Sequence, residues 1–316
     1  MPKNRIALVD STIDYNVHKK NLIDEYSFLP KGNRNVVNNH GTLCCSAILS
    51  INPLAEIYSI PVLNDDNQCL TETILEALNY LLDIDVDIIN LSLSTSSVEY
   101  EKEYERYIKR LREQGKIVIS SLANNHSISI PARLPEVIGV QGNLFVNEHE
   151  YWFNRTYQIQ CVADSKPVLL RANHGEYQLF GGNSKATAIF SGIVSSMYIY
   201  NCESELFLEK KANKNIWTEV IPEEFEFNPI EINEILYQRL KELVINVFEI
   251  LDRDVDKIEQ NRLYNCGLTK YNTIMLLKEI EREFRVEIDY KDVTIYWFYS
   301  LENLYYKIFG RGKKHE

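Results

Sequence analysis

One serine opens the run that decides the fold, Gly182-Asn183-Ser184-Lys185-Ala186-Thr187-Ala188-Ile189-Phe190-Ser191-Gly192. Small residues flank Ser184 and a run without helix breakers follows, which predicts a serine at the entrance of a buried helix. The N–H groups and dipole of a helix N-terminus favour an oxyanion, so this placement suits a nucleophile. A serine that only caps the helix is the commoner alternative. A catalytic interpretation therefore needs a base, an acid and an oxyanion donor from elsewhere in the chain.

Composition sets the class of protein. The chain has 316 residues, 45% of them hydrophobic, and a formal net charge of -11. This length favours two domains, and the acidic balance argues against nucleic acid or an anionic membrane as a partner. The six cysteines form no CxxC pair, which favours free thiols in a reducing compartment. Because we find no signal peptide and no run as long as a membrane span, we expect a cytoplasmic protein.

Strands and helices alternate along the first half of the chain. Apolar runs typical of buried strands occupy residues 6–9, 55–62, 86–94 and 116–121. Helical patterns separate them, at residues 43–49, 71–82 and 100–114. This alternation predicts an α/β fold with a doubly wound parallel sheet.

Two further polar residues stand at positions that suit catalysis. Asp10 ends the first predicted strand, and open α/β sheets place their sites at such ends. His40 begins the first predicted long helix, where Gly41 and Thr42 give it a tight entry turn. A turn-forming aspartate and an ordinary surface histidine are the alternatives when each residue is taken alone.

Four motifs stand in one order along residues 4–200: Asp10-Ser11-Thr12, His40-Gly41-Thr42, Ala123-Asn124 and Gly182-Asn183-Ser184-Lys185-Ala186-Thr187. This part of the chain resembles the subtilisin-like (S8, subtilase) serine peptidases, whose triad runs Asp, His, Ser. The similarity extends to residues 89–93 and 130–138.

The resemblance implies a role for each matching residue. Ser184 would be the nucleophile, His40 the general base and then acid, and Asp10 the residue that orients His40. Asn124 would donate to the oxyanion together with the Ser184 backbone N–H. Two backbone segments would grip an extended peptide by strand addition. Their residues are Ser92, Leu93, Ser94, Ser121, Leu122 and Ala123.

Several positions depart from the family pattern. Thr12, Asn183 and Ala188 replace the usual Gly, Thr and Pro, and they motivate an alternative in which the fold is kept only for binding. Ser94 and Ala123 stand where the family commonly has Gly in the first specificity pocket, so we expect a preference for small residues before the cut. We expect no pro-segment before Asp10, and no calcium or other metal.

The second half is predicted to be helical. We place the peptidase domain at residues 1–202, a linker at 203–227 and an all-α domain at 228–316, with helices near 230–251, 271–284 and 300–308. The last part resembles an acyl or peptidyl carrier domain, a four-helix bundle, through its Gly267-Leu268 turn and residues 276–288. Lys270 stands where a carrier has its phosphopantetheine serine, so we expect no phosphopantetheine. A purely stabilising helical domain is the alternative.

Together these features predict an intracellular serine endopeptidase that cleaves a dedicated peptide. Carrier-like domains accompany some ribosomal peptide maturation systems. We therefore expect leader removal from a bacteriocin-like precursor, with the second domain as a docking module for the precursor or a maturation enzyme. A catalytically weak scaffold of the same fold is the alternative, and Lys270 argues against an acyl-carrier protein.

Overall fold

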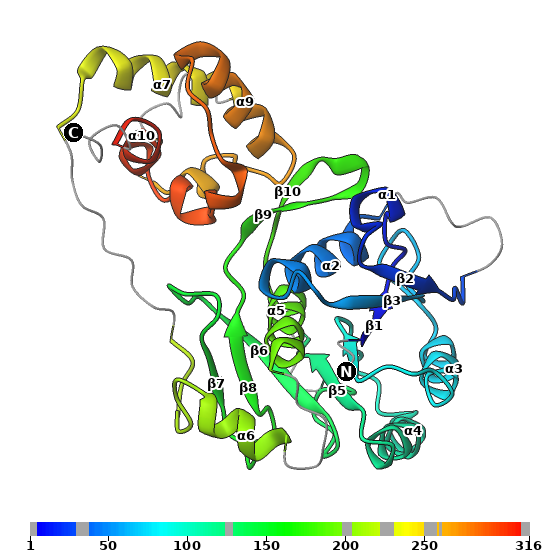
Figure 1. The fold of residues 1–316 in the computed structure, drawn as a ribbon. Helices are drawn as coiled ribbons and strands as arrows, with labels where there is room; N and C mark the ends of the chain where they lie inside the picture. Colours follow the sequence, from blue (N-terminus) through cyan, green and yellow to red (C-terminus); the bar gives the residue numbers. More distant parts are fainter. Residues whose placement is uncertain are drawn as a thin grey trace. The chain divides into compact units, whose positions relative to one another are not determined.

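The computed structural model of the chain divides into two compact units (Figure 1). It describes residues 5–29, 38–123, 129–197, 204–221, 231–249, 258 and 261–310. The first unit comprises residues 1–166, 171–176 and 181–223, and the second comprises residues 167–170, 177–180 and 224–316. Among the described residues, no helix combines the length and apolar character needed to cross a membrane.

An eight-stranded sheet forms the centre of the first unit, in the order β2-β3-β1-β4-β5-β6-β8-β7. All neighbours pair in parallel except β7 and β8. The strands are β1 (Arg5–Asp10), β2 (Leu22–Glu25), β3 (Glu56–Pro61), β4 (Ile88–Leu91), β5 (Ile117–Ser121), β6 (Ile138–Asn143), β7 (Tyr151–Phe153) and β8 (Cys161–Asp164). The predicted α/β fold with a parallel sheet is therefore confirmed.

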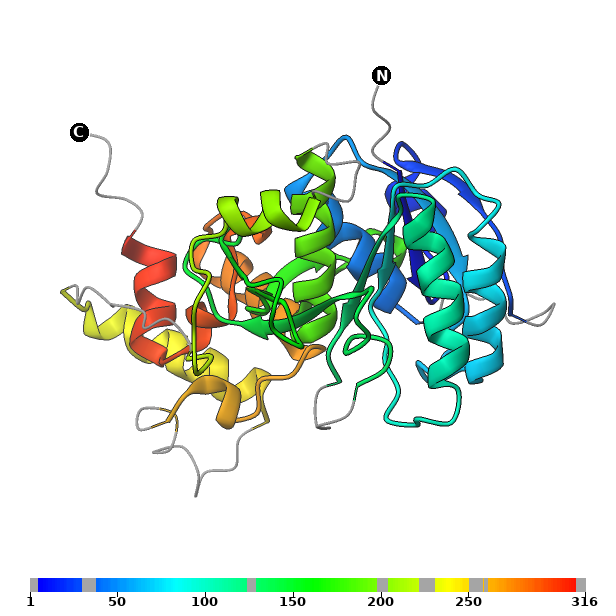
Figure 2. The same cartoon turned by 90° about the horizontal axis from the view of Figure 1, so that it is seen from below.

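Helices cover both faces of this sheet. The helices α3 (Thr71–Tyr80) and α4 (Glu101–Glu113) pack on one face, where their apolar residues share a core with Ala7 and Val9 of β1. Figure 2 shows α3 and α4 side by side. The helices α2 (His40–Ile51) and α5 (Asn183–Ser196) pack together and against the strands. Because successive strand side chains point to opposite faces, one sheet supports two apolar layers.

The order of the strands creates a crevice at the centre of the sheet. The chain begins at β1, adds β3 and β2 on one side, and then continues with β4 on the other. Adjacent loops at such a reversal leave the sheet in opposite directions, which opens space at the carboxyl ends of the two strands. Asp10 ends β1 and Ser92 follows β4, so both lie at this crevice.

The first part of the predicted linker is a helix of the first unit. Residues 204–211 form α6 (Ser204–Lys211), whose Leu208 is buried and accepts a hydrogen bond from the Tyr151 hydroxyl through its carbonyl. Further along, Trp217 packs on Trp152 of β7. The predicted linker, residues 203–227, therefore contains at residues 204–221 a helix and apolar contacts of the first unit. The many charged residues of this stretch hide its few apolar anchors.

The second unit has its own apolar core. Three α-helices have bounds within its described residues: α7 (Glu234–Val247), α9 (Asn272–Phe284) and α10 (Leu301–Phe309). Short 3₁₀ helices, η3 (Leu263–Asn265), η4 (Tyr290–Asp292) and η5 (Ile295–Phe298), connect and flank them. Leu240, Leu276 and Phe298 are completely buried in this core. Residues 250–257, 259 and 260, which lie between α7 and α9, fall outside the described part, so the four-helix carrier bundle stays a prediction.

A hairpin earlier in the chain also belongs to this second unit. Its strands are β9 (Val168–Arg171) and β10 (Tyr177–Phe180). Leu169 joins the helical core, and its N–H donates to the Val293 carbonyl at 3.1 Å. The predicted second domain, residues 228–316, did not include these strands, because a short apolar run does not reveal which core it joins.

Candidate active site

Asp10 lies at the carboxyl end of β1 and is completely buried. Its Oδ1 accepts hydrogen bonds from the Ser11 N–H and from Nδ1 of His40, both at 2.7 Å. Its Oδ2 is buried and has no hydrogen-bond partner in the described part of the chain. A buried carboxylate with so few donors depends strongly on the histidine for its stabilisation.

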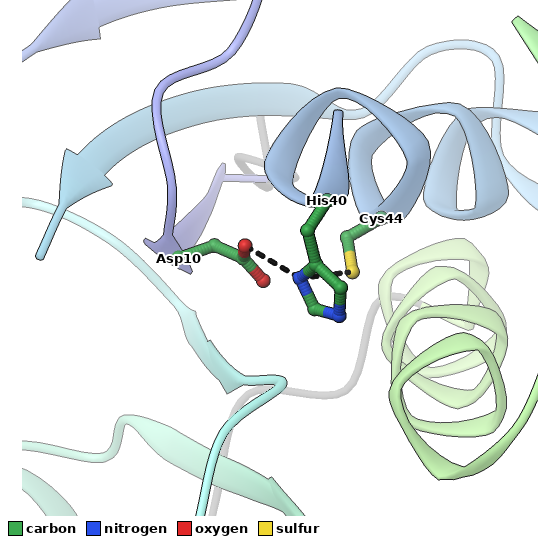
Figure 3. Close-up of side chains that lie close together, drawn as sticks. All are labelled: Asp10, His40 and Cys44. Atoms are coloured by element: carbon green, nitrogen blue, oxygen red, sulfur yellow. Dashed lines mark hydrogen bonds and ion pairs between the residues drawn. The ribbon is translucent and has the colours of Figure 1, made fainter. Parts of the chain in front are cut away.

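His40 is the first residue of α2, and the approach of this helix to β1 places it beside Asp10. Gly41 makes that approach possible, because a Cβ there would lie 2.2 Å from the Ser11 carbonyl oxygen. The Gly41 N–H donates to Ser11 Oγ at 2.9 Å, which ties the helix start to the strand end. Figure 3 shows Asp10, His40 and Cys44 pointing toward one another. The sequence predicted a tight entry turn here, and its physical cause is this contact.

The charge of Asp10 controls the titration of His40. Burial is the largest single influence and lowers the pKa of the imidazole, but the Asp10 carboxylate and, after it, Cys44 together outweigh burial, so the pKa lies well above its ordinary value. The hydrogen bond also fixes Nδ1 as the protonated nitrogen of the neutral ring. A histidine held in this way has the basicity and tautomer that a general base requires.

Cys44 lies one turn after His40, with its sulfur 3.8 Å from Nδ1 of that histidine. Asp10, His40 and Cys44 thus offer three possible metal ligands within 4.8 Å of one another. Burial raises the pKa of the Cys44 thiol, which keeps it protonated. Because a cysteine binds metal as its thiolate, this environment favours proton transfer by the Asp–His pair over metal binding.

Hydrogen bonds between buried polar residues fix the position of α2. Thr42 accepts a hydrogen bond from the Asp14 N–H at 2.9 Å and donates to the Asn173 side chain at 2.6 Å. His18 is also buried, and its Nε2 lies 2.9 Å from Ser46 Oγ. Burial lowers the pKa of His18 to about 4, so this imidazole is neutral near pH 7. These contacts hold the helix that carries His40.

Ser184 occupies the first turn of α5, as the sequence predicted. The preceding Gly182 has φ 85°, a conformation that glycine adopts at no steric cost. Ser184 Oγ donates to the Ser92 carbonyl at 3.2 Å, and Ser92 Oγ lies 3.2 Å from the Ser184 carbonyl. A hydroxyl has a single proton, so this proton must turn from Ser92 to the base before the serine can attack.

The two neighbours of Ser184 anchor the helix start to three strand ends. Asn183 accepts from the Gly142 N–H and donates to the Leu122 carbonyl, both at 2.8 Å. Lys185 is completely buried and donates to Asp164 Oδ2 at 2.6 Å. Ser184 is therefore placed by the residues on both sides of it.

A cleft of about 630 Å³ contains both His40 and Ser184. All six residues predicted as substrate walls line it: Ser92, Leu93, Ser94, Ser121, Leu122 and Ala123. Asn124, the predicted oxyanion donor, lies outside the described residues. The structure thus brings His40, Ser184 and both predicted walls together in one cleft, and Asp10 lies behind His40, bonded to its Nδ1.

Sequence reasoning missed two groups of residues near the site. Cys69, Thr71 and Ile74 line the cleft, but nothing in their local pattern distinguished them from ordinary helix and loop residues. The Lys185–Asp164 ion pair was also missed. A lysine inside an otherwise apolar helix start was the available signal, because a buried lysine needs a carboxylate partner.

Comparison with known proteins agrees with this geometry. Residues 4–201 match the model of the subtilase family. The chain belongs to this family. It is a serine protease of the subtilisin type, as the order of Asp10, His40 and Ser184 indicated.

The relatives of this chain are also named as serine proteases or subtilisins. The chain is similar to the major intracellular serine protease of Bacillus subtilis (strain 168), with 25% identity, covering 69% of each chain. It is 22% identical to subtilisin amylosacchariticus of Bacillus subtilis subsp. amylosacchariticus, over 60% of this chain and 53% of that protein. The fold resembles the crystal structure of a cold adapted subtilisin-like serine proteinase, with a TM-score of 0.54 and 15% identity, covering 67% of this chain and 83% of the other.

Proposed function

We propose that this protease is an intracellular endopeptidase that cleaves a dedicated precursor peptide through an acyl-enzyme intermediate. The observation that carries the proposal is that His40, held by its hydrogen bond to Asp10, lines the same cleft of about 630 Å³ as Ser184. Two relatives are named intracellular serine proteases, those of Bacillus subtilis and Paenibacillus polymyxa, which supports the location.

The chemistry follows from the positions of the side chains. Ser184 Oγ attacks the scissile carbonyl while His40 accepts its proton, and Asp10 stabilises the imidazolium that forms. His40 then gives this proton to the leaving amine. A water molecule, deprotonated by His40, then attacks the acyl-enzyme ester, and Ser184 takes back the proton as the second product leaves. We assign oxyanion stabilisation to the Ser184 backbone N–H and to the side chain of Asn124. The mechanism needs neither a metal nor phosphopantetheine.

A fluorophosphonate probe tests the nucleophile directly. We expect the probe to label Ser184 in the full chain and to leave the Ser184→Ala variant unlabelled. Hydrolysis of a short internally quenched peptide should fall by about 10⁵–10⁶-fold in the same variant. Equal labelling of both proteins would refute the assignment.

The walls of the cleft support a preference for small residues before the scissile bond. Ser94 and Ala123 both line the cleft, and their side chains add volume where a glycine would leave space. We expect Ala or Ser at this substrate position to be cleaved about ten times faster than Phe, because excluding a large side chain costs about 1–3 kcal/mol. Equal rates for the two peptides would contradict a narrowed pocket.

We assign the second unit a docking role in leader removal. Its helix α9 exposes Tyr271, at its N-cap, and Met275, with 76% and 56% of their surfaces accessible. The precursor that copurifies with the Ser184→Ala variant would serve as the substrate. Changing both residues to serine should raise KM for this precursor but not for a short peptide. The matched control is Ile235→Ser, an exposed position on α7.

A scaffold that binds a peptide without cleaving it is the second candidate. Thr12, Asn183 and Ala188 favour it, because they depart from the family pattern beside the triad. Precursor binding without fluorophosphonate labelling would support the scaffold. Labelling and cleavage together would support the protease.

A further inference from the structure

A second hollow, of about 520 Å³, lies between α3, α4 and the segment that follows β2. We call it the aromatic pocket, because Tyr26, Phe28, Tyr80 and Tyr107 line it. The helix α3 lines both sites. Its residues Thr71 and Ile74 line the active-site cleft, and its residue Leu75 lines the aromatic pocket.

The aromatic wall is held in place by the backbone and by ring contacts. The N–H groups of Tyr26 and Phe28 donate to the carbonyls of Ser59 and Pro61 at 3.0 and 2.9 Å. In an extended segment, residues two apart point to the same side, so both rings face α3. Tyr26 stacks on Tyr80 with ring centroids 4.2 Å apart. The wall is therefore built before any ligand binds.

Negative charge surrounds these rings. Four carboxylates line the pocket, those of Glu72, Glu76, Asp83 and Glu103. The only cation among its lining residues is Arg106, whose guanidinium lies 4.7 Å from the centre of the Tyr107 ring. Aromatic faces and carboxylates both attract cations, and Arg106 already makes the expected stacking contact on one ring.

We propose that the aromatic pocket is an exosite for a lysine or arginine side chain of the peptide whose scissile bond lies in the cleft. The inference rests on the proposed peptidase function. Its chemistry is that of a cation placed against tyrosine rings and neutralised by carboxylates. Because all four carboxylate residues of the pocket are exposed to solvent, we expect a modest gain in affinity that salt weakens.

The spacing along α3 sets where the cation must lie in the substrate. From Thr71 at the cleft to Asn79 at the far side of the pocket, the helix rises by roughly 12 Å. An extended peptide covers this distance in about four residues. The basic residue should therefore lie about four residues beyond the part of the substrate that the cleft holds.

Paired peptides test the exosite in the full-length protease. Every peptide has the same cleavable core, joined through a Gly-Ser spacer to a tail of either three lysines or three glutamines. In one set of peptides the tail is at the N-terminus, and in the other set it is at the C-terminus. We expect the lysine tail on one of the two ends to raise kcat/KM by about three- to tenfold at low ionic strength, mainly through KM. This preference should largely disappear in 0.5 M salt.

Two variants locate the effect. The double variant Glu76→Gln/Glu103→Gln should remove most of the lysine preference, and Tyr26→Leu should reduce it. The matched control, Glu105→Gln/Glu113→Gln, changes the same charge at exposed positions of α4 outside the pocket and should keep the preference.

The outcomes separate this proposal from the proposed function. Equal lysine and glutamine rates in the unmodified protease, or an unchanged preference in the double variant, would overturn the exosite. Hydrolysis of the short core peptide and labelling of Ser184 would still report the peptidase in either case. Loss of both readouts would instead overturn the proposed function.

Discussion

Two buried aspartates of the same sheet have parallel positions and different consequences. Asp10 ends β1 and bonds to His40 at the start of α2, at 2.7 Å. Asp164 ends β8 and bonds to Lys185 in the first turn of α5, at 2.6 Å. Both aspartates are completely buried. Their partners differ in exposure, since 21% of the His40 side chain is exposed and none of the Lys185 side chain is.

This difference explains why one pair can do chemistry and the other can only hold structure. His40 reaches the cleft and can change its charge near neutral pH, so it can accept and return a proton. Lys185 is sealed away from solvent, and its charge compensates that of Asp164. Two charges removed from water in this way cost about as much as their attraction returns. The Lys185 pair therefore fixes the position of Ser184 more than it stabilises the fold.

Removing the charge of Asp10 gives the largest expected effect. In Asp10→Asn, the imidazole loses the partner that sets its tautomer and stabilises its protonated form. We expect kcat to fall by about 10⁴-fold with little loss of folding. Peptide hydrolysis and urea unfolding of the same preparation measure the two quantities. Substantial activity in this variant would mean that His40 does not depend on Asp10.

Removing the charge of Asp164 should act on stability instead. Asp164→Asn leaves the Lys185 ammonium buried without a counter-ion, so we expect a loss of about 3–5 kcal/mol in the free energy of unfolding. The double variant Asp164→Asn/Lys185→Met removes both charges, keeps an acceptor for the Phe145 and Lys166 N–H groups, and should recover most of this loss. If the single and double variants unfold at the same urea concentration, the charge pair is not the cause.

The pH dependence of stability tests whether buried His18 helps to hold α2 in place. Its pKa is about 4 in the folded chain and 6.5 ordinarily, so the unfolded chain binds the proton more tightly. The stabilisation is complete above pH 6.5 and is lost as the pH falls toward 4, by up to about 3 kcal/mol. His18→Asn should show a shallower loss over this range. Parallel urea titrations of both proteins would reveal identical slopes if His18 were not involved.

The raised pKa of His40 predicts the smallest effect, a shift of the pH profile. Only the neutral imidazole can act as the base, so activity falls as the pH drops through that pKa. We expect the midpoint of the acidic limb of kcat/KM to lie above pH 6.5. Residual activity of Asp10→Asn should have its midpoint at lower pH. A midpoint below 6.5 in the unmodified protease would mean that burial outweighs the Asp10 charge and Cys44 in setting the pKa of His40.

Local sequence was most informative where a pattern fixes the backbone. The apolar run at residues 6–9 predicted β1, and the breaker-free run after Ser184 predicted α5. The linker was predicted poorly, because the charges of residues 204–221 conceal Leu208 and Trp217. Apolar contacts made by isolated residues leave no periodic signal.

The sequence by itself determined the alternation of strands and helices and the order of the motifs around Asp10, His40 and Ser184, because each depends on neighbours along the chain. Only the tertiary structure decided that Lys185 pairs with Asp164, that Asn183 joins Gly142 to Leu122, and that Tyr26 stacks on Tyr80. These contacts join segments distant in the sequence, and the energies that select them depend on burial, which a linear pattern does not contain.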